Sequence, residues 1–299
     1  DIIPTDVIQE GTYGDNVHWY LGADGTLAVT GEGEIADVAD MSSDSTPWYA
    51  YQAQIRKIAI GDGITRIGKG TFAGMGYVKE ITMADSVKEI GQSAFSGVMP
   101  RTADPGVQRT ITLSQSLEKI DEYAFTESNL AKVNIPDSVR EIGYAAFRRC
   151  YDLKSVTIGE NSKLESIGNL AFEDCTLDSG TINIPSTVKT IKSVAFGNGH
   201  FADQVVFSEQ LQELGLRAFG YGSTGMNKVF FTGDAPVISD DTIAKNPGDT
   251  VFPDTTTMIY YPKDNPTWNN YDFTKLMKVV QATGVDKKDM QHFIDGEVE

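Results

Sequence analysis

One motif recurs along most of this 299-residue chain and limits what it can fold into. Its clearest copy reads Val-Asn-Ile-Pro-Asp-Ser-Val-Arg-Glu-Ile-Gly-Tyr-Ala-Ala-Phe and ends at Phe147. The closing phenylalanines of the copies are Phe72, Phe95, Phe125, Phe147, Phe172, Phe196 and Phe219. Their successive spacings are 23, 30, 22, 25, 24 and 23 residues. A period of this length is typical of solenoids, whose units bury their apolar faces against one another.

The apolar positions keep a fixed distance from each phenylalanine. Five residues before it stand Ile67, Ile90, Ile120, Ile142, Ile167, Ile191 and Leu214. Three residues earlier stand Ile64, Val87, Leu117, Val139, Leu164, Val188 and Leu211. A short alternating stretch precedes these, as in Val133-Asn-Ile135, and period-two alternation predicts a strand with one buried face. We therefore expect stacked coils whose apolar ladders, including one column of phenylalanines, form a continuous core.

A glycine follows the isoleucine in most copies, and we expect it to form a tight corner with a positive φ. These glycines are Gly68, Gly91, Gly143, Gly168 and Gly215. Asp121 and Lys192 replace the glycine in the other two copies, so we expect a corner that tolerates side chains.

These residues resemble the BspA-type leucine-rich repeat family, whose unit reads roughly I-x-I-P-x-x-V-x-x-I-G-x-x-A-F-x-x-C. The resemblance covers about residues 55–235. It implies a mainly β solenoid, a right-handed leucine-rich-repeat superhelix with seven repeats of about 24 residues. It also implies a secreted or cell-surface protein of host-associated bacteria that takes part in adhesion.

The segments outside the repeats are expected to cover the ends of the solenoid. Residues 1–54 read as an N-terminal β-hairpin cap with a turn at Asp24-Gly25, followed by a helix that begins with Thr46 as N-cap and Pro47. Residues 55–235 hold the repeats. Residues 236–284 are expected to form a C-terminal cap that includes Trp268, and residues 285–299 a frayed tail or linker.

Charge and composition narrow the classes of partner. The chain carries 25 basic and 42 acidic residues, a net charge of −17, which disfavours nucleic acid and anionic membranes. No apolar run approaches the about 18 residues that a membrane-spanning helix needs. We therefore expect a monomer that binds a protein or a glycan, without membrane insertion.

No constellation of residues indicates catalysis. The stretch Gly63-Ile-Thr-Arg-Ile-Gly-Lys-Gly-Thr approaches a phosphate-binding loop, but Gly70 stands where that loop needs a hydroxyl group, and the repeat register explains the stretch. The three histidines, His18, His200 and His292, are far apart in the sequence. The glutamates at repeat positions are expected to face solvent: Glu80, Glu89, Glu118, Glu141 and Glu165. We therefore expect no enzyme activity and no cofactor.

Two further groups have a structural interpretation. Cys150 and Cys175 both lie three residues after a phenylalanine, in a slot that Met75 and Val98 fill in other copies. We therefore expect buried, reduced thiols in neighbouring coils, with a disulfide between them as the alternative. A series of aspartates near the C-terminus lacks the spacing of a calcium loop, although adventitious calcium stays open. Its members are Asp234, Asp240, Asp241, Asp249 and Asp254.

Surface recognition is the remaining class of function. The residue between the two apolar positions of each strand is expected to face outward, which gives Ala59, Thr82, Thr112, Asn134, Thr157, Asn183, Val206 and Phe230. We take Thr82, Thr112, Asn134, Thr157 and Asn183 as a candidate binding row. A second candidate is the basic and aromatic cluster of Arg148, Arg149 and Tyr151. The alternative is that these three are ordinary loop residues without a role in binding.

The chain is thus expected to be an extracellular, non-catalytic binding or adhesion module, secreted or anchored to the cell surface. It would recognise proteins or glycans on host or microbial surfaces. The alternative is a non-catalytic targeting appendage of a larger secreted enzyme, suggested by the polar C-terminal residues.

Overall fold

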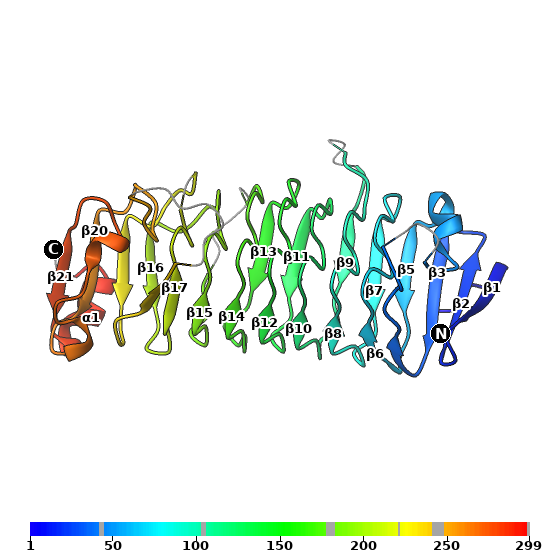
Figure 1. Cartoon of the computed structure of the whole chain (residues 1–299), viewed down its shortest axis with the longest axis horizontal. Coiled ribbons are helices and arrows are strands. Elements are labelled where there is room, and N and C mark those ends of the chain that lie inside the picture. Colours follow the sequence, from blue (N-terminus) through cyan, green and yellow to red (C-terminus); the bar gives the residue numbers. More distant parts are fainter. Residues whose placement is uncertain (42–44, 103–105, 178–182, 221, 241–247, 298–299) are drawn as a thin grey trace.

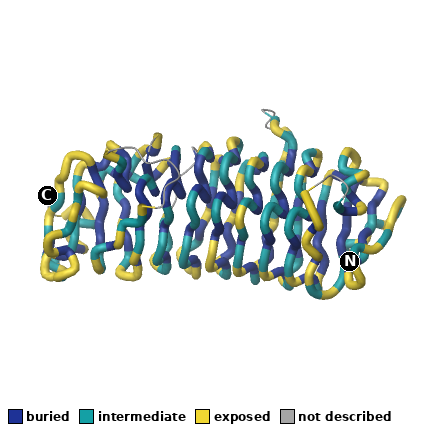
Figure 2. The backbone as a smooth tube through the Cα atoms, viewed as in Figure 1, coloured by how far each residue is buried: buried dark blue, intermediate teal, exposed yellow. Residues whose placement is uncertain are grey.

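A computed structural model describes residues 1–41, 45–102, 106–177, 183–220, 222–240 and 248–297. The chain forms one elongated stack of coils with its two termini at opposite ends (Figure 1). Buried residues run along the whole length of the stack, and exposed residues concentrate at the turns and the ends (Figure 2).

One wall of the solenoid carries the longer strands, and we call it the segmented face because it consists of three separate sheets. A six-stranded sheet has the order β1-β2-β3-β5-β7-β9, a two-stranded sheet pairs β11 with β13, and a four-stranded sheet has the order β16-β18-β20-β21. The strands of the first sheet are β1 (Val7–Tyr13), β2 (Val17–Gly22), β3 (Thr26–Gly31), β5 (Lys57–Ile60), β7 (Glu80–Met83) and β9 (Thr110–Thr112). The other strands are β11 (Lys132–Ile135), β13 (Ser155–Ile158), β16 (Gln204–Phe207), β18 (Lys228–Phe231), β20 (Met258–Pro262) and β21 (Ala282–Val285).

A second wall is a nine-stranded sheet that runs without interruption from β4 to β19. Its strands are β4 (Gly33–Ile35), β6 (Ile64–Ile67), β8 (Glu89–Ile90), β10 (Lys119–Ile120), β12 (Glu141–Ile142), β14 (Ser166–Ile167), β15 (Thr190–Ile191), β17 (Glu213–Gly215) and β19 (Val237–Ser239). Among the described strands, the pairings are parallel except those of β1 with β2 and β2 with β3. The isoleucines of the motif pair directly across this sheet, as Ile120 does with Ile142.

The phenylalanines form the buried column that the spacing predicts. All seven are fully buried, and each ring lies 5.1–5.6 Å from the next with interplanar angles of 2–9°. The column is longer than the motif, because Trp48 stacks on Phe72 at one end and Phe252 on Phe219 at the other. The indole of Trp48 also donates a 2.9 Å hydrogen bond to the carbonyl of Thr71, which covers the first coil.

Glycine recurs at the corners of the coils, but the expectation that it has a positive φ there is wrong. None of the five has a positive φ. A Cβ on Gly68 would lie 2.1 Å from the carbonyl oxygen of Ile35, and one on Gly91 would lie 2.6 Å from that of Ile67. At these corners a glycine avoids a clash with the backbone of the preceding coil, while Asp121 and Lys192 show that other coils leave room for a side chain.

The N-terminal segment agrees with the sequence in its hairpin and differs in its helix. Strands β2 and β3 pair around a turn in which Gly25 has a φ of 86° and Asp24 accepts a hydrogen bond from the Thr26 amide. The helix that follows is a 3-10 helix, η1 (Tyr49–Gln54), preceded by Trp48 and without a side-chain cap. The prediction of a Thr46 N-cap is therefore wrong, because the helix begins two residues later, after Trp48, whose indole is buried.

The C-terminal segment is more ordered than the predicted frayed tail. After η2 (Pro266–Trp268), η3 (Phe273–Lys275) and β21, residues Lys287–Ile294 form the helix α1. Its Met290 is buried in a cluster with Phe230 and Val285, and its Phe293 packs against Tyr260. Met290, Phe293 and Ile294 dock the helix, although the residues around them are polar. The polar composition alone therefore wrongly predicted a frayed tail.

Candidate binding surface

The candidate row lies on the segmented face, where the central residues keep the outward orientation that alternation predicts. Thr112, Asn134 and Thr157 are exposed, while their strand neighbours Val133 and Ile135 are buried. Thr82 is half-buried. Asn183 is exposed but lies outside any strand, and part of the strand expected around it falls outside the described residues.

Two outward positions are covered, so their expected exposure was wrong. Ala59 is only 2% exposed. The N-terminal residues lie against this part of the sheet, because the Ile2 side chain lies 3.1 Å from a Cβ placed on Gly61 and the Ala23 amide donates to the carbonyl of Asp6. An alanine at position 59 leaves room for such a segment.

Phe230 is the second covered position, with 1% of its surface exposed. Its ring stacks on Tyr260 at 4.6 Å, and α1 closes over both. The neighbouring Val206, which pairs with Phe230 in the sheet, remains 37% exposed. The apolar end of the outward row is therefore mostly a packing surface for the C-terminal segment.

The row is not one continuous ladder. Thr82 pairs with Thr112, and Asn134 pairs with Thr157, but β9 and β11 belong to different sheets. The expected row therefore divides into short stretches, whose exposed and polar part is centred on Thr112, Asn134 and Thr157.

The residues of the second candidate, Arg148, Arg149 and Tyr151, do not form one cluster. Arg148 donates a 2.6 Å hydrogen bond from Nε to the carboxylate of Glu173, whose side chain is 7% exposed. Partial burial opposes the charged form of Arg148, but the hydrogen bond and the charge of Glu173 hold its pKa above the usual value. Arg148 is thus engaged in a partly buried ion pair.

Arg149 is also engaged by its own fold. It has a φ of 58°, and its guanidinium lies 3.6 Å from a carboxylate oxygen of Glu127. Its Nε is buried, with no hydrogen-bond partner in the described part of the chain. Both arginines therefore pair with a glutamate of a neighbouring coil, and neither guanidinium is left without an acidic partner.

Tyr151 remains available, with 45% of its surface exposed. The guanidinium of Arg101 lies over its ring, 5.8 Å from the centroid. Sequence reasoning missed Arg101, because it belongs to the insertion that lengthens the Phe95–Phe125 interval and has no repeat register. Its contact spans 50 residues of sequence and arises only when the coils are stacked.

The three histidines and the segment that resembles a phosphate-binding loop contact other parts of the fold. The ring of His18 stacks on Tyr20 at 4.5 Å, His200 bonds to Thr224 and His292 to Glu297. The segment that resembles a phosphate-binding loop is strand β6 and the turn after it, with Ile64 and Ile67 in the core.

Within the described ranges, no three His, Cys, Asp or Glu side chains are placed to hold a metal ion, and Asp241 lies outside those ranges. The described helices include none that is long and apolar enough to cross a membrane.

Comparisons with known proteins agree with the repeat register. The model of the BspA type leucine rich repeat region matches residues 46–105 and 118–247 in six copies. A leucine-rich repeat protein from Eubacterium ventriosum is 20% identical with a TM-score of 0.47, over 86% of this chain and 73% of that one. One from Bacteroides ovatus is 19% identical with a TM-score of 0.46, over 91% and 76%.

A leucine rich cell surface protein from Faecalibacterium prausnitzii is 17% identical with a TM-score of 0.36, over 96% of this chain and 98% of that one. A search of curated proteins gives no match.

Proposed function

Because this chain belongs to the BspA-type leucine-rich repeat family, we propose that it is a non-catalytic binding module whose ligand lies across the segmented face. We further propose that it works outside the cell, secreted or anchored to the surface, and adheres as a monomer to proteins or glycans of host or microbial surfaces. The finer architecture belongs to this proposal: a right-handed superhelix of seven repeats at residues 55–235, with caps at 1–54 and 236–284.

One observation supports the position of the ligand. Thr112, Asn134 and Thr157 present hydroxyl and amide groups to solvent, and the inward side chains of β11 and β13 are buried in the core. Such groups form hydrogen bonds with little loss of backbone freedom, because the coils on both sides hold these strands in place. An extended polar surface of this kind suits a large ligand better than a small one.

The test begins with an array of glycans and extracellular matrix proteins probed with the whole chain. Two double variants are then compared: Thr112→Arg with Thr157→Arg, and Thr112→Glu with Thr157→Glu. Affinity for the partner is expected to fall in both, because both place longer side chains in the contact. If charge alone determined affinity, one double variant would bind more tightly than the parent and the other more weakly.

A matched control adds the same charges to the nine-stranded sheet. Thr65, in β6, and Gln212, directly before β17, are both exposed, so Thr65→Arg with Gln212→Arg, and the two Glu equivalents, should leave affinity unchanged. All variants should unfold within about 0.5 kcal/mol of the parent, as exposed substitutions usually do. Equal loss in the control variants, or turnover of array ligands by the purified chain, would contradict the proposal.

A further inference from the structure

The strands of the segmented face from β5 onward run in the same direction, so the turns that lead into them gather along one long edge. We call this the strand-entry edge. Five exposed cations stand on it, from β5 to β13, and we call them the basic strip: Arg56, Lys79, Arg101, Lys132 and Lys154. Backbone hydrogen bonds join neighbouring coils along the edge, from Lys79 to Arg56 at 2.7 Å and from Lys154 to Ala131 at 3.0 Å.

The cations of the basic strip have no acidic partner among the described residues, although Arg56 donates a 2.7 Å hydrogen bond to the carbonyl of Ala53. In the described part of the chain, none of its five members forms an ion pair. Two acids that lie close to Lys79 and Lys154 in the sequence pair with other cations. Glu80 lies 3.5 Å from Lys57, and Asp152 accepts a 2.7 Å bond from Arg109, whose side chain is only 9% exposed.

Two tyrosines stand among these cations. Tyr77 is 51% exposed, and the guanidinium of Arg56 lies 5.4 Å from its ring centroid. Tyr151 has the same arrangement with Arg101. Each arginine holds its ring in a fixed orientation through a cation–π contact, while about half of the tyrosine remains open to a ligand.

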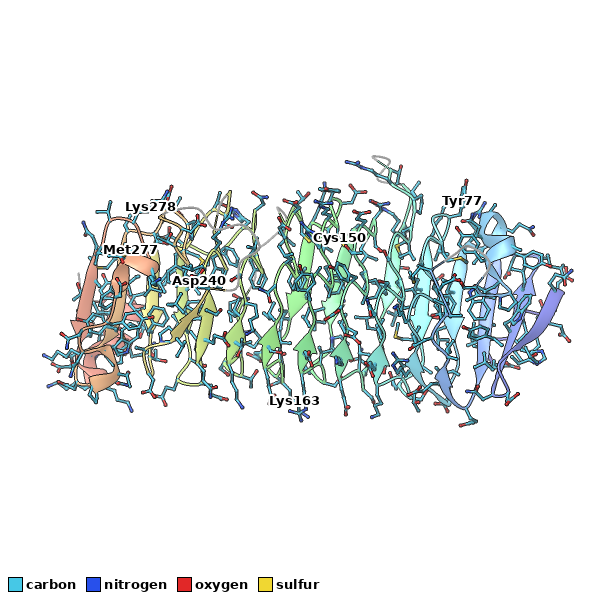
Figure 3. The ribbon with its side chains drawn as sticks, viewed as in Figure 1. Tyr77, Cys150, Lys163, Asp240, Met277 and Lys278 are labelled. Atoms are coloured by element: carbon cyan, nitrogen blue, oxygen red, sulfur yellow. The ribbon has the colours of Figure 1, made fainter. Side chains whose placement is uncertain are left out.

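The opposite long edge, where the strands end, exposes a series of acidic side chains, with Lys163 among them. Its turns expose Asp62, Asp85, Asp137, Glu160, Glu209 and Asp234. Figure 3 places Tyr77 at one long edge and Lys163 at the other. The net charge of −17 therefore does not exclude a locally basic stretch at the strand-entry edge from β5 to β13. Fixed charges more than about 8–10 Å apart are largely screened at physiological ionic strength, so a ligand at the strand-entry edge interacts mainly with the basic strip.

We propose that the strand-entry edge binds an acidic polysaccharide, with its carboxylate or sulfate groups on the basic strip and its sugar rings against Tyr77 and Tyr151. This rests on the proposed function and specifies its ligand. The cations lie beside Thr112, Asn134 and Thr157, whose hydroxyl and amide groups can bond to sugar hydroxyls. Protein interfaces need an apolar centre, and the described part of this edge offers only the two tyrosine rings, so a polar polymer fits better.

The test measures binding of the whole chain by calorimetry to heparin, polygalacturonate, neutral dextran and poly-L-glutamate. At least one of the two acidic polysaccharides should bind, with an affinity that falls as salt is raised. Dextran should not bind, and poly-L-glutamate should bind more weakly. Binding of dextran or poly-L-glutamate with equal affinity would overturn the proposal.

Charge-reversal variants locate the site. Lys132→Glu with Lys154→Glu should weaken binding of the acidic polysaccharide by about tenfold or more, since two attractive contacts become repulsive. Lys88→Glu with Lys163→Glu makes the same change in net charge at exposed positions outside the strip and should alter affinity by less than about twofold. Equal loss in both double variants would overturn the assignment to this edge.

The contribution of stacking is tested at Tyr151. Tyr151→Ala should weaken binding of the polysaccharide but leave binding of poly-L-glutamate unchanged, and Tyr151→Phe should retain both. Equal effects on both polymers would contradict the sugar contact. If the chain binds a protein or neutral glycan through Thr112 and Thr157 but neither acidic polysaccharide, this inference fails while the proposed function stands.

Discussion

The contribution of one buried ring can be measured at Phe147, in the middle of the aromatic column. Its ring lies 5.2 Å from Phe125 and 5.1 Å from Phe172, and it is fully buried. Phe147→Ala is expected to lower the free energy of unfolding by about 3–5 kcal/mol, through lost burial and the cavity left between two coils. Urea unfolding gives the value. Thr157→Ala, on the exposed side of β13, is the control and should change it by less than about 0.5 kcal/mol; a similar loss for both would argue against the column as the main core.

The two cysteines are free and buried, as the register predicts, and the structure adds a reason for their chemistry. Cys150 donates a 3.2 Å hydrogen bond to the carbonyl of Phe125, and Cys175 donates one of the same length to that of Phe147. Ser128 makes the equivalent bond to Phe95 one coil earlier. The slot accepts a purely apolar side chain, as in Met75 and Val98, but in three coils it holds a small side chain that donates to the preceding coil, which the purely apolar interpretation of the sequence did not include.

This arrangement predicts a pH dependence. Burial raises the pKa of the Cys175 thiol well above its ordinary value of 9.0. The raised pKa stabilises the fold fully below pH 9, and that stabilisation is lost as the pH rises further, because the unfolded thiol ionises first. The free energy of unfolding of the parent should therefore fall more between pH 8 and 10 than that of Cys175→Ser, which keeps the donor but does not ionise in this range. Parallel profiles would contradict the assignment. A thiol reagent should modify both cysteines only after unfolding.

At the scale of the element, the segment that contains each phenylalanine adopts an unusual backbone. The residue two before the phenylalanine has a positive φ, although in six copies it is not glycine: Ser93, Tyr123, Ala145, Leu170, Val194 and Arg217. Amides in this segment bond to the next coil, as Phe147 does to Ala171 at 2.7 Å. These bonds between coils outweigh a local cost of about 1–2 kcal/mol for each left-handed residue.

Ser93 offers a test of that local cost. The first copy of the motif already has a glycine here, Gly70, with a φ of 69°. Ser93→Gly should therefore stabilise the chain, by up to about 1 kcal/mol, because it removes the steric penalty. Thr82→Gly, in the extended backbone of β7, should destabilise it by about 0.5–1 kcal/mol. Thermal unfolding of the two variants gives the comparison. Destabilisation by Ser93→Gly would show that a contact of the serine side chain contributes more free energy than the left-handed backbone costs.

At the scale of the whole molecule, each coil is stabilised mainly by its two neighbours. Hydrogen exchange measured by mass spectrometry should therefore be slowest in the coils of Phe125, Phe147 and Phe172, and faster toward both ends of the stack. Peptides from the exposed turns between strands provide the reference for rapid hydrogen exchange. Equal protection of all coils would show instead that the molecule opens only as one cooperative unit.

The sequence by itself determined the coil. The isoleucine ladder, the phenylalanine column and the alternation around Asn134 follow from spacing, because every copy repeats the same apolar positions and each must be buried against the next. The central outward residues Thr112, Asn134 and Thr157 could be predicted for the same reason. Alternation decides which side of its own strand a residue faces, and no segment among the described residues covers these three side chains.

Only the tertiary structure decided what lies over the coils and between them. Phe230 alternates like Asn134, yet it is buried because a helix 60 residues later docks on it. Trp48 and Phe252 extend the column from outside the motif, and Arg148 is neutralised by Glu173 one coil away. These contacts depend on how segments with no common register meet in space. A repeat pattern fixes the position of a residue within its own coil, and it carries no information about which distant segment will cover or pair with that residue.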